Sequence, residues 1–274
     1  MILRIVLVIA IAACAGGCGD DGNGKTTVTA GFYPLAWAAE RIGGRHVDVQ
    51  NLTPPGSEPH DLELTPREVA DIQRANLVLY LGHGFQPAVT TAAENAQGRR
   101  IDLLAGLPLR GDDPHVWLDP NLFMRIAQRI GRALDRSASP LAKKLRQLDG
   151  DFRAGLRDCR RREIVTSHEA FGYLAARYRL KEVAITGIEP ESEPSPKQLT
   201  DVVRVVRRTG ATTVFFETLV SPRLAQTVAR EVGAHTAALN PLEGLTTDQQ
   251  REGDDYLSLM RDNLTTLREA LGCR

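Results

Sequence analysis

Three histidines follow expected strands, and imidazole nitrogen is a donor that Zn²⁺ readily accepts in proteins. His60 lies in PPGSEPHDLE, His115 in DPHVWLDP and His168 in TSHEAF. In open α/β sheets, ligands bind in the crevice beyond the carboxyl ends of the strands. Loops that meet there could bring three imidazoles onto one metal ion. Taken singly, each histidine is better explained as an ordinary core or surface residue.

The other three histidines have weaker claims to such a site. His46 precedes a strand and His235 begins one, which is the wrong end for a ligand. His83 follows a strand in LGHG and could lie near the crevice.

The order of elements predicts two α/β lobes with mostly parallel sheets flanked by helices. Strands are expected at 26–30, 47–52, 77–81, 164–166, 183–186, 214–216 and 236–239. Helices are expected at 34–42, from a capping box at Thr65, at 121–135, 170–178 and 196–209, after Ser221-Pro222, and at 256–271. Residues 26–138 would form the first lobe and 160–274 the second.

Residues 139–159 are expected to form a single connecting helix between the lobes. Apolar residues recur there every three or four positions, which gives one apolar face. They are Leu141, Leu145, Leu148, Phe152 and Leu156. An ordinary surface helix of one lobe is the alternative.

The first 17 residues are typical of a secretory signal, with Arg4 followed by an apolar run too short to span a bilayer. Ala15-Gly16-Gly17-Cys18 is similar to a bacterial lipoprotein cleavage site, so Cys18 is the expected lipid-bearing residue. Processing at Cys14, or a signal cleaved without lipid, is the alternative. Residues 18–25 would then form a flexible Gly/Asp tether to the membrane.

Composition narrows the class of protein further. The 274-residue chain has 34 basic and 34 acidic side chains, and this lack of a basic surplus argues against nucleic-acid binding. Cys159 and Cys273 remain outside the leader, and an even pair in an exported chain favours a disulfide over free thiols.

Six segments in this order resemble the metal-binding solute receptors of bacterial ABC uptake systems for zinc and manganese. They are PGSEPHDLELTP, DPHVWLDP, TSHEAFGYLA, GIEPESEPSPKQL, FFETLVSP and LNPLEGLT. The resemblance implies two lobes joined by one long helix, with the metal in the cleft between them and His60, His115 and His168 as ligands. It also implies an extracytoplasmic, lipid-anchored receptor, not an enzyme, that delivers Zn²⁺ to an ABC permease and its ATPase.

The resemblance also points to the fourth ligand. Many members have Asp at the place of Asn240, whereas a zinc branch with N-P-[LI]-E binds through the Glu, which is Glu243 here. Asn240 or water are the alternatives. Nearby acids expected to orient the imidazoles are Glu58, Asp119, Glu193 and Glu217.

Two other functions remain to be weighed. A manganese receptor of the same fold would have more oxygen donors, and His168 stands where a Glu would signal manganese. An envelope zinc hydrolase would use three protein ligands and a water, but His168-Glu169-Ala170-Phe171-Gly172 is not H-E-x-x-H.

Overall fold

The computed structural model describes residues 24–274. The expected signal segment 1–17, Cys14, Cys18 and most of the tether lie outside the described residues. Among the residues described, no helix is both long enough and apolar enough to cross a membrane.

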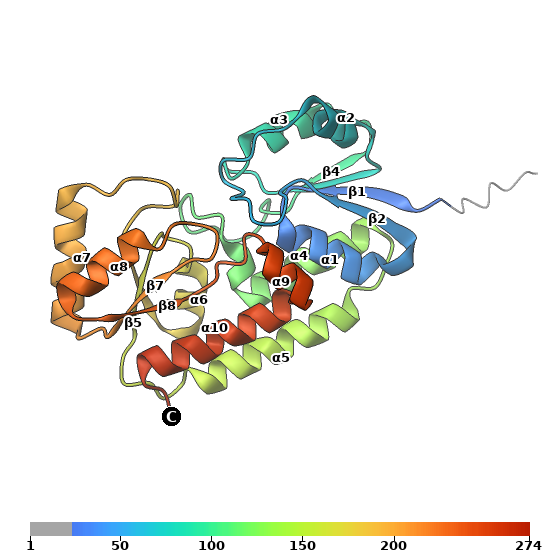
Figure 1. Cartoon of the computed structure of the whole chain (residues 1–274). Helices are drawn as coiled ribbons and strands as arrows, with labels where there is room; N and C mark the ends of the chain where they lie inside the picture. Colours follow the sequence, from blue (N-terminus) through green and yellow to red (C-terminus); the bar gives the residue numbers. More distant parts are fainter. Residues whose placement is uncertain (1–23) are drawn as a thin grey trace, which may run out of the picture.

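Two four-stranded parallel sheets form the framework (Figure 1). The first contains β1 (Thr26–Ala30), β2 (Val47–Asn51), β3 (Leu77–Tyr80) and β4 (Arg99–Asp102), in the order β2-β1-β3-β4. The second contains β5 (Glu163–Thr166), β6 (Lys181–Ala184), β7 (Thr213–Phe216) and β8 (His235–Ala238), in the order β6-β5-β7-β8. The predicted α/β class with two lobes is confirmed, and both sheets have the same topology.

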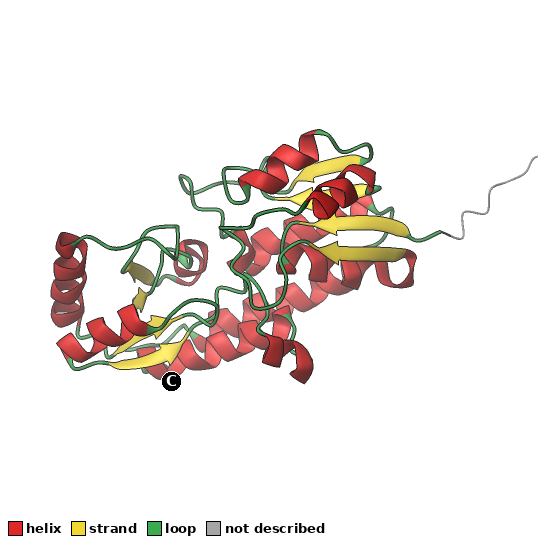
Figure 2. Ribbon diagram, turned by 45° about the horizontal axis from the view of Figure 1, so that its top comes forward, coloured by secondary structure: helices red, strands yellow, loops and turns green. Residues whose placement is uncertain are grey.

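Apolar side chains on each sheet set the register and the layers. Val28 lies opposite Val49 and Leu77, and Val165 lies opposite Val183 and Val214. Helices cover both faces of each sheet, which buries residues of the central strands β1, β3, β5 and β7, while most residues of the edge strands are exposed or half-buried (Figure 2).

In the first lobe the helices are α1 (Tyr33–Gly43), α2 (Pro66–Arg74), α3 (Pro87–Glu94), α4 (Pro120–Ala133) and the 3₁₀ turns η1 (Gly44–His46) and η2 (Val116–Leu118). The connecting helix is α5 (Ser139–Gly155). It is followed by α6 (Gly172–Tyr178), α7 (Pro196–Thr209), α8 (Arg223–Val232), α9 (Thr247–Glu252) and α10 (Tyr256–Leu271).

Local sequence explains where several helices begin. The Thr65 side chain accepts a hydrogen bond from the Glu68 amide at 3.3 Å, and the Glu68 carboxylate accepts one from the Thr65 amide at 2.7 Å, which confirms the capping box of α2. Ser195 and Gln198 do the same for α7. The helix expected after Ser221-Pro222 is present as α8, but the expected side-chain cap is not, because Pro222 takes the N-cap position and no side chain caps that helix.

The long helices α5 and α10 lie side by side beneath both sheets (Figure 1). The apolar face expected for the connector is buried, with Leu145, Leu148 and Phe152 at 0% exposure. One continuous core includes these residues together with Val28 of the first lobe and Ile164 of the second. This core spans both lobes, and each lobe also has a smaller core of its own, around Val78 in the first lobe and Val214 in the second.

The chain after β8 returns to the first lobe before α10 runs back to the second. The Tyr256 ring stacks on Trp37 at 5.1 Å between centroids, and Arg41 pairs with Asp255 at 2.9 Å. At the other end of α10, Cys273 forms the predicted disulfide with Cys159. The terminal helix is thus anchored in both lobes.

Candidate metal centre

Four buried side chains from separate parts of the chain converge between the lobes. Glu243 Oε1 lies 3.0 Å from His115 Nε2, 3.3 Å from His60 Nε2 and 3.5 Å from His168 Nε2. The Nε2 atoms of His115 and His168 are 3.3 Å apart. His115, His168 and Glu243 are 0% exposed, and His60 is 7% exposed. The structure thus brings together the four residues expected to be ligands.

The spacing of these donors matches a small tetrahedral ion. A tetrahedron whose centre is 2.0–2.1 Å from each corner, the bond length of Zn²⁺ to imidazole, has edges of about 3.3–3.4 Å. Four of the six donor separations, at 3.0 to 3.5 Å, scatter around that value, and all four donor atoms lie within 4.8 Å of one another. Three nitrogens and one carboxylate oxygen are also a donor set that Zn²⁺ accepts.

His60 comes from the loop that follows β2. Its ring meets the edge of Phe85 at 4.7 Å between centroids, and its backbone amide donates to Glu58 at 3.1 Å. Buried Gln86 ties this loop to β1 by donating to the carbonyl oxygens of Pro59 and Gly31. The hydrogen bonds from Gln86 therefore hold the loop in place next to His60.

His115 is oriented by Asp113, two residues earlier in the loop that follows β4. The Asp113 carboxylate accepts from the His115 backbone amide at 2.9 Å and from its Nδ1 at 2.8 Å. A proton on Nδ1 leaves the lone pair of Nε2 directed toward the centre, where it can bind a metal ion. Sequence reasoning missed Asp113, although the Asp-x-His spacing in DPHV allows this turn.

His168 follows β5 and is oriented by Glu217, which follows β7. Glu217 Oε1 accepts from His168 Nδ1 at 2.7 Å, as expected for an acid behind a ligand. Glu182 brackets the same loop by accepting from Thr166 Oγ1 at 2.9 Å and from the Phe171 amide at 3.0 Å. Burial raises the pKa of Glu182 to about 7.

Glu243 projects from a tight turn that begins at Asn240. The Asn240 side-chain oxygen accepts from the Leu242 amide at 2.7 Å, and Leu242 has a φ of 58° that non-glycine residues rarely adopt. Asn263 of α10 holds the Asn240 backbone at both ends, with distances of 2.8 and 2.6 Å. Asn240 therefore shapes the turn, because its side-chain oxygen is taken up by the Leu242 amide.

The turn is also fixed to the first lobe. Trp117 Nε1, buried in η2 just after His115, donates to the Pro241 carbonyl oxygen at 2.7 Å. The sites of His115 and Glu243 are thereby linked by a direct hydrogen bond between their loops.

The electrostatics of the cluster favour an added positive charge. Burial would lower the pKa of His168, but Glu217 and Glu243 outweigh it and raise that pKa well above 6.5. Burial likewise opposes ionisation of His115, yet hydrogen bonds to Asp113 and Glu243 raise its pKa. Burial would raise the pKa of Glu243, but the three imidazoles hold it well below its usual range.

The cluster also contains unsatisfied donors and acceptors. With Nδ1 of His115 and of His168 donating outward, each Nε2 can donate to Glu243 only as an imidazolium. Glu243 Oε2 is buried and has no hydrogen-bond partner. A divalent cation would supply the missing charge in place of these protons.

The remaining expected acids divide into two groups. Glu58 lies beside the cluster, and burial together with the Glu243 carboxylate raises its pKa to about 8, so it is a neutral neighbour. Asp119 instead caps α4 by accepting from the Asn121 amide at 2.8 Å, and it also lies near Arg177. Glu193 is exposed. Neither Asp119 nor Glu193 contacts an imidazole of the cluster.

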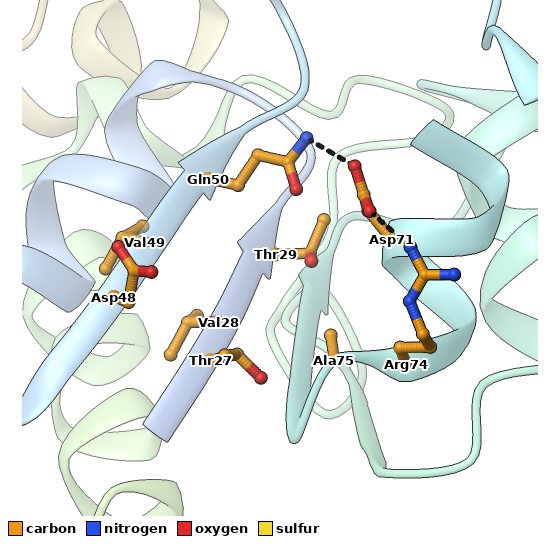
Figure 3. A pocket seen from close by; sticks show the side chains of 9 residues that line it. All are labelled: Thr27, Val28, Thr29, Asp48, Val49, Gln50, Asp71, Arg74 and Ala75. Atoms are coloured by element: carbon orange, nitrogen blue, oxygen red, sulfur yellow. Dashed lines mark hydrogen bonds and ion pairs between the residues drawn. The ribbon is translucent and has the colours of Figure 1, made fainter. Parts of the chain in front are cut away.

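His46, His83 and His235 are exposed and stand apart from the cluster. Figure 3 shows another hollow, of about 210 Å³, between β1, β2 and α2. Asp71 lies there between Gln50 and Arg74 and bonds to both, at 3.4 and 2.8 Å. Its charge is compensated, so this hollow lacks the unpaired donors of the histidine cluster.

Comparisons with known proteins agree with this geometry. The family model described as "Zinc-uptake complex component A periplasmic" matches residues 28–270. The zinc-binding protein AdcA of Streptococcus pyogenes is 30% identical over 90% of this chain, which spans about half (56%) of that relative's length. The high-affinity zinc uptake system protein ZnuA of Bacillus subtilis is 32% identical over 95% of this chain and 93% of its own.

A solved structure shares the fold as well. The Zn(II)-bound ZnuA-like domain of Streptococcus pneumoniae AdcA superposes with a TM-score of 0.78 at 31% identity, over 90% of this chain and 99% of that domain. The family match covers nearly the whole described chain. The chain therefore belongs to the ZnuA family of periplasmic zinc-uptake components.

Proposed function

We propose that this chain is an extracytoplasmic receptor that binds Zn²⁺ through His60, His115, His168 and Glu243 and delivers it to an ABC permease and its ATPase. The observation that carries the proposal is the convergence of four buried donors whose separations fit one tetrahedral ion. The ion is cargo, so the site must bind and later release it. The relatives named for zinc binding and zinc uptake support this function.

The donor set favours zinc over the two alternatives. Manganese prefers more oxygen donors than the single carboxylate of this cluster. A zinc hydrolase keeps one coordination position open for water, whereas Glu243 would fill the fourth position here. A hydrolase would also need a general base beside the metal. Glu169, the acid next to His168, is exposed, so it does not lie among the buried donors.

Attachment to the membrane is part of the same proposal. A lipid on Cys18, followed by the tether up to residue 25, would keep the receptor close to its permease. The effective concentration gained by such tethering raises the rate of encounter without any added contact.

Metal titration of single variants tests the site. Zn²⁺ affinity should fall by several orders of magnitude in His115→Ala and in His168→Ala, because each variant loses one of the four buried donors. Glu243→Gln should bind more weakly with unchanged folding. Unaltered Zn²⁺ affinity in both histidine variants would contradict the proposal, and tighter binding of Mn²⁺ than Zn²⁺ by the unmodified protein would favour a manganese receptor.

A further inference from the structure

An arginine-lined pocket lies in the second lobe, between the C-terminal ends of α5 and α6. Its volume is about 200 Å³, and buried Leu156 and Tyr178 contribute to its wall. Five guanidinium groups surround it, and no acidic side chain is among the residues that line it. We call this the arginine pocket, formed by Arg153, Arg157, Arg162, Arg177 and Arg179.

Three of these arginines are fixed in place by the fold. Asp149 of α5 accepts from Arg153 Nε and from Arg177 Nε, each at 2.9 Å. Arg162 donates to the carbonyl oxygens of Leu156 and Arg157, at 2.7 and 2.6 Å, and so satisfies the end of α5. These three guanidinium groups form a preorganised frame.

The other two arginines have no comparable structural role. Arg157 and Arg179 are exposed, and between residues 24 and 274 neither side chain makes a hydrogen bond or an ion pair. Arg179 also occupies the left-handed position that ends α6, with a φ of 58°, where glycine is the favoured residue. An arginine at this position adds a cation to the pocket at a conformational cost.

The charges in the pocket are poorly balanced. Five guanidinium groups share two carboxylates, Asp149 and Asp119, which leaves three positive charges uncompensated. Burial would raise the pKa of Asp149, yet its hydrogen bonds to Arg177 and Arg153 lower that pKa to about 2. Mutual repulsion among the arginines would be relieved by an anion.

We propose that the arginine pocket binds a phosphate group. The planar guanidinium fork matches the oxygen geometry of phosphate and can bind it with two parallel hydrogen bonds. Arg157 and Arg179 supply the free donors, while the frame supplies fixed positive charge. The pocket is formed by residues separate from the histidine cluster, so phosphate binding does not depend on zinc. Free phosphate and the headgroup of an anionic phospholipid share this chemistry.

Titration of the metal-free full chain with inorganic phosphate, at constant ionic strength, tests the site. Phosphate should raise the thermal unfolding temperature of the unmodified protein. In Arg157→Gln/Arg179→Gln the affinity should fall by about tenfold or more, since hydrogen bonds between charged groups are lost. The matched control, Arg45→Gln/Arg208→Gln, removes the same charge from exposed positions outside the pocket and should bind phosphate normally.

Vesicles of phosphatidylglycerol and of phosphatidylcholine identify the source of the phosphate. If the protein sediments with phosphatidylglycerol vesicles but not with phosphatidylcholine vesicles, and this binding is lost in the pocket variant and kept in the control, the pocket binds a lipid headgroup. Phosphate binding without vesicle binding assigns it to a free anion. Unchanged zinc affinity in the pocket variant shows that it folds. The proposal is overturned if phosphate has no effect on the unmodified protein, or if both double variants respond to it equally.

Discussion

Asp113 and Glu217 decide which ring nitrogen of His115 and His168 faces the centre. Each carboxylate accepts from Nδ1, at 2.8 and 2.7 Å, so the lone pair on Nε2 is directed inward. The carboxylates also add negative charge behind the imidazoles, which makes them better donors to a cation. Metal affinity therefore depends on residues that do not touch the metal.

Asp113→Asn is expected to weaken Zn²⁺ binding by about 10- to 100-fold, as loss of a carboxylate behind a ligating histidine does elsewhere. All four donors remain, so the protein should still bind one ion per chain. Isothermal titration with a competing chelator measures the change. Asp119→Asn is the matched control, because Asp119 caps α4 away from the cluster and Asn is also a good cap. Equal affinities in the two variants would contradict the assigned role of Asp113.

Zinc affinity should rise with pH through and above 6.5. The pKa values of His115 and His168 are raised, so protons occupy the centre until the solution is more alkaline than the ordinary histidine range. Zinc must displace these protons, and acid therefore competes with the metal. Titrations over a series of pH values, each in two buffers of different ionisation enthalpy, count the protons released.

The same shifts affect the metal-free protein in the opposite direction. A raised folded-state pKa stabilises the fold below the unfolded value of 6.5, and that contribution is lost as pH rises through the raised value. Glu217→Gln removes one carboxylate that raises the pKa of His168. The unfolding free energy of this variant should therefore vary less with pH above 6.5 than that of the unmodified protein. A variant with the same pH dependence as the unmodified protein would show that Glu217 does not act on His168.

At the scale of elements, the turn at 240–243 depends on α10. Asn263 is 3% exposed and satisfies both the amide and the carbonyl of Asn240, which in turn accepts from the Leu242 amide. These bonds hold Leu242 in its left-handed conformation and set the direction of Glu243. A helix residue thus positions the only anionic donor of the cluster.

Asn263→Ala should therefore weaken zinc binding as well as folding. Two buried backbone groups would lose their partner, at about 1–3 kcal/mol each in the free energy of unfolding. Ser195→Ala is a useful comparison, since loss of the α7 cap costs about 1 kcal/mol far from the turn. Zinc affinity should fall in Asn263→Ala alone. If both variants lose stability and neither loses affinity, the bond from Trp117 to Pro241 suffices to hold the turn.

Elements with a strong local pattern could be predicted from the sequence. The α10 helix combines apolar periodicity with a glycine at Gly272, and the starts of α2 and α7 contain capping boxes. Weaker patterns placed elements less well: β6 begins and ends two residues earlier than expected, at Lys181 and Ala184, because its bounds are set by pairing with β5, where Glu163 lies opposite Lys181. The short elements α3, β4 and α9 were not predicted, and α9 buries none of its residues.

The metal site could be predicted from the sequence only in part. Three histidines after strands suggested a metal, but nothing in the local pattern around Glu243 marks it as a donor, and its role came from the resemblance. Its position depends on Asn263 and Trp117, which are distant in sequence. Long-range packing of this kind has no local periodicity, so it appears only in the folded chain.

At the scale of the whole molecule, the largest hydrophobic core and two helices, α5 and α10, span both lobes. Separating the lobes would expose Trp117, Tyr256 and Phe123, all at 0% exposure. Exposure of such side chains costs about 1.5–3 kcal/mol each. Domain closure of the clamshell kind is therefore too costly for routine binding and release.

Removal of zinc with a chelator should leave the overall shape unchanged. Small-angle X-ray scattering of the loaded and metal-free protein is expected to give the same radius of gyration. Hydrogen exchange should quicken locally, in the loop around His60 and the turn at 240–243, because only these segments adjust. An expansion of the whole molecule on metal removal would contradict the rigid shared core.

Enclosure of the donors affects the time for which an ion stays bound. His115, His168 and Glu243 are 0% exposed, so no chelator in solution can reach an ion held there and pull it away. We expect the ion to leave through the loop carrying His60, the least buried of the four donors at 7% exposure, so that the rate of loss would be set by the opening of that loop and not by the chelator. A membrane partner that pressed on this loop would shorten the residence time by contact alone, with no chemical change to any ligand.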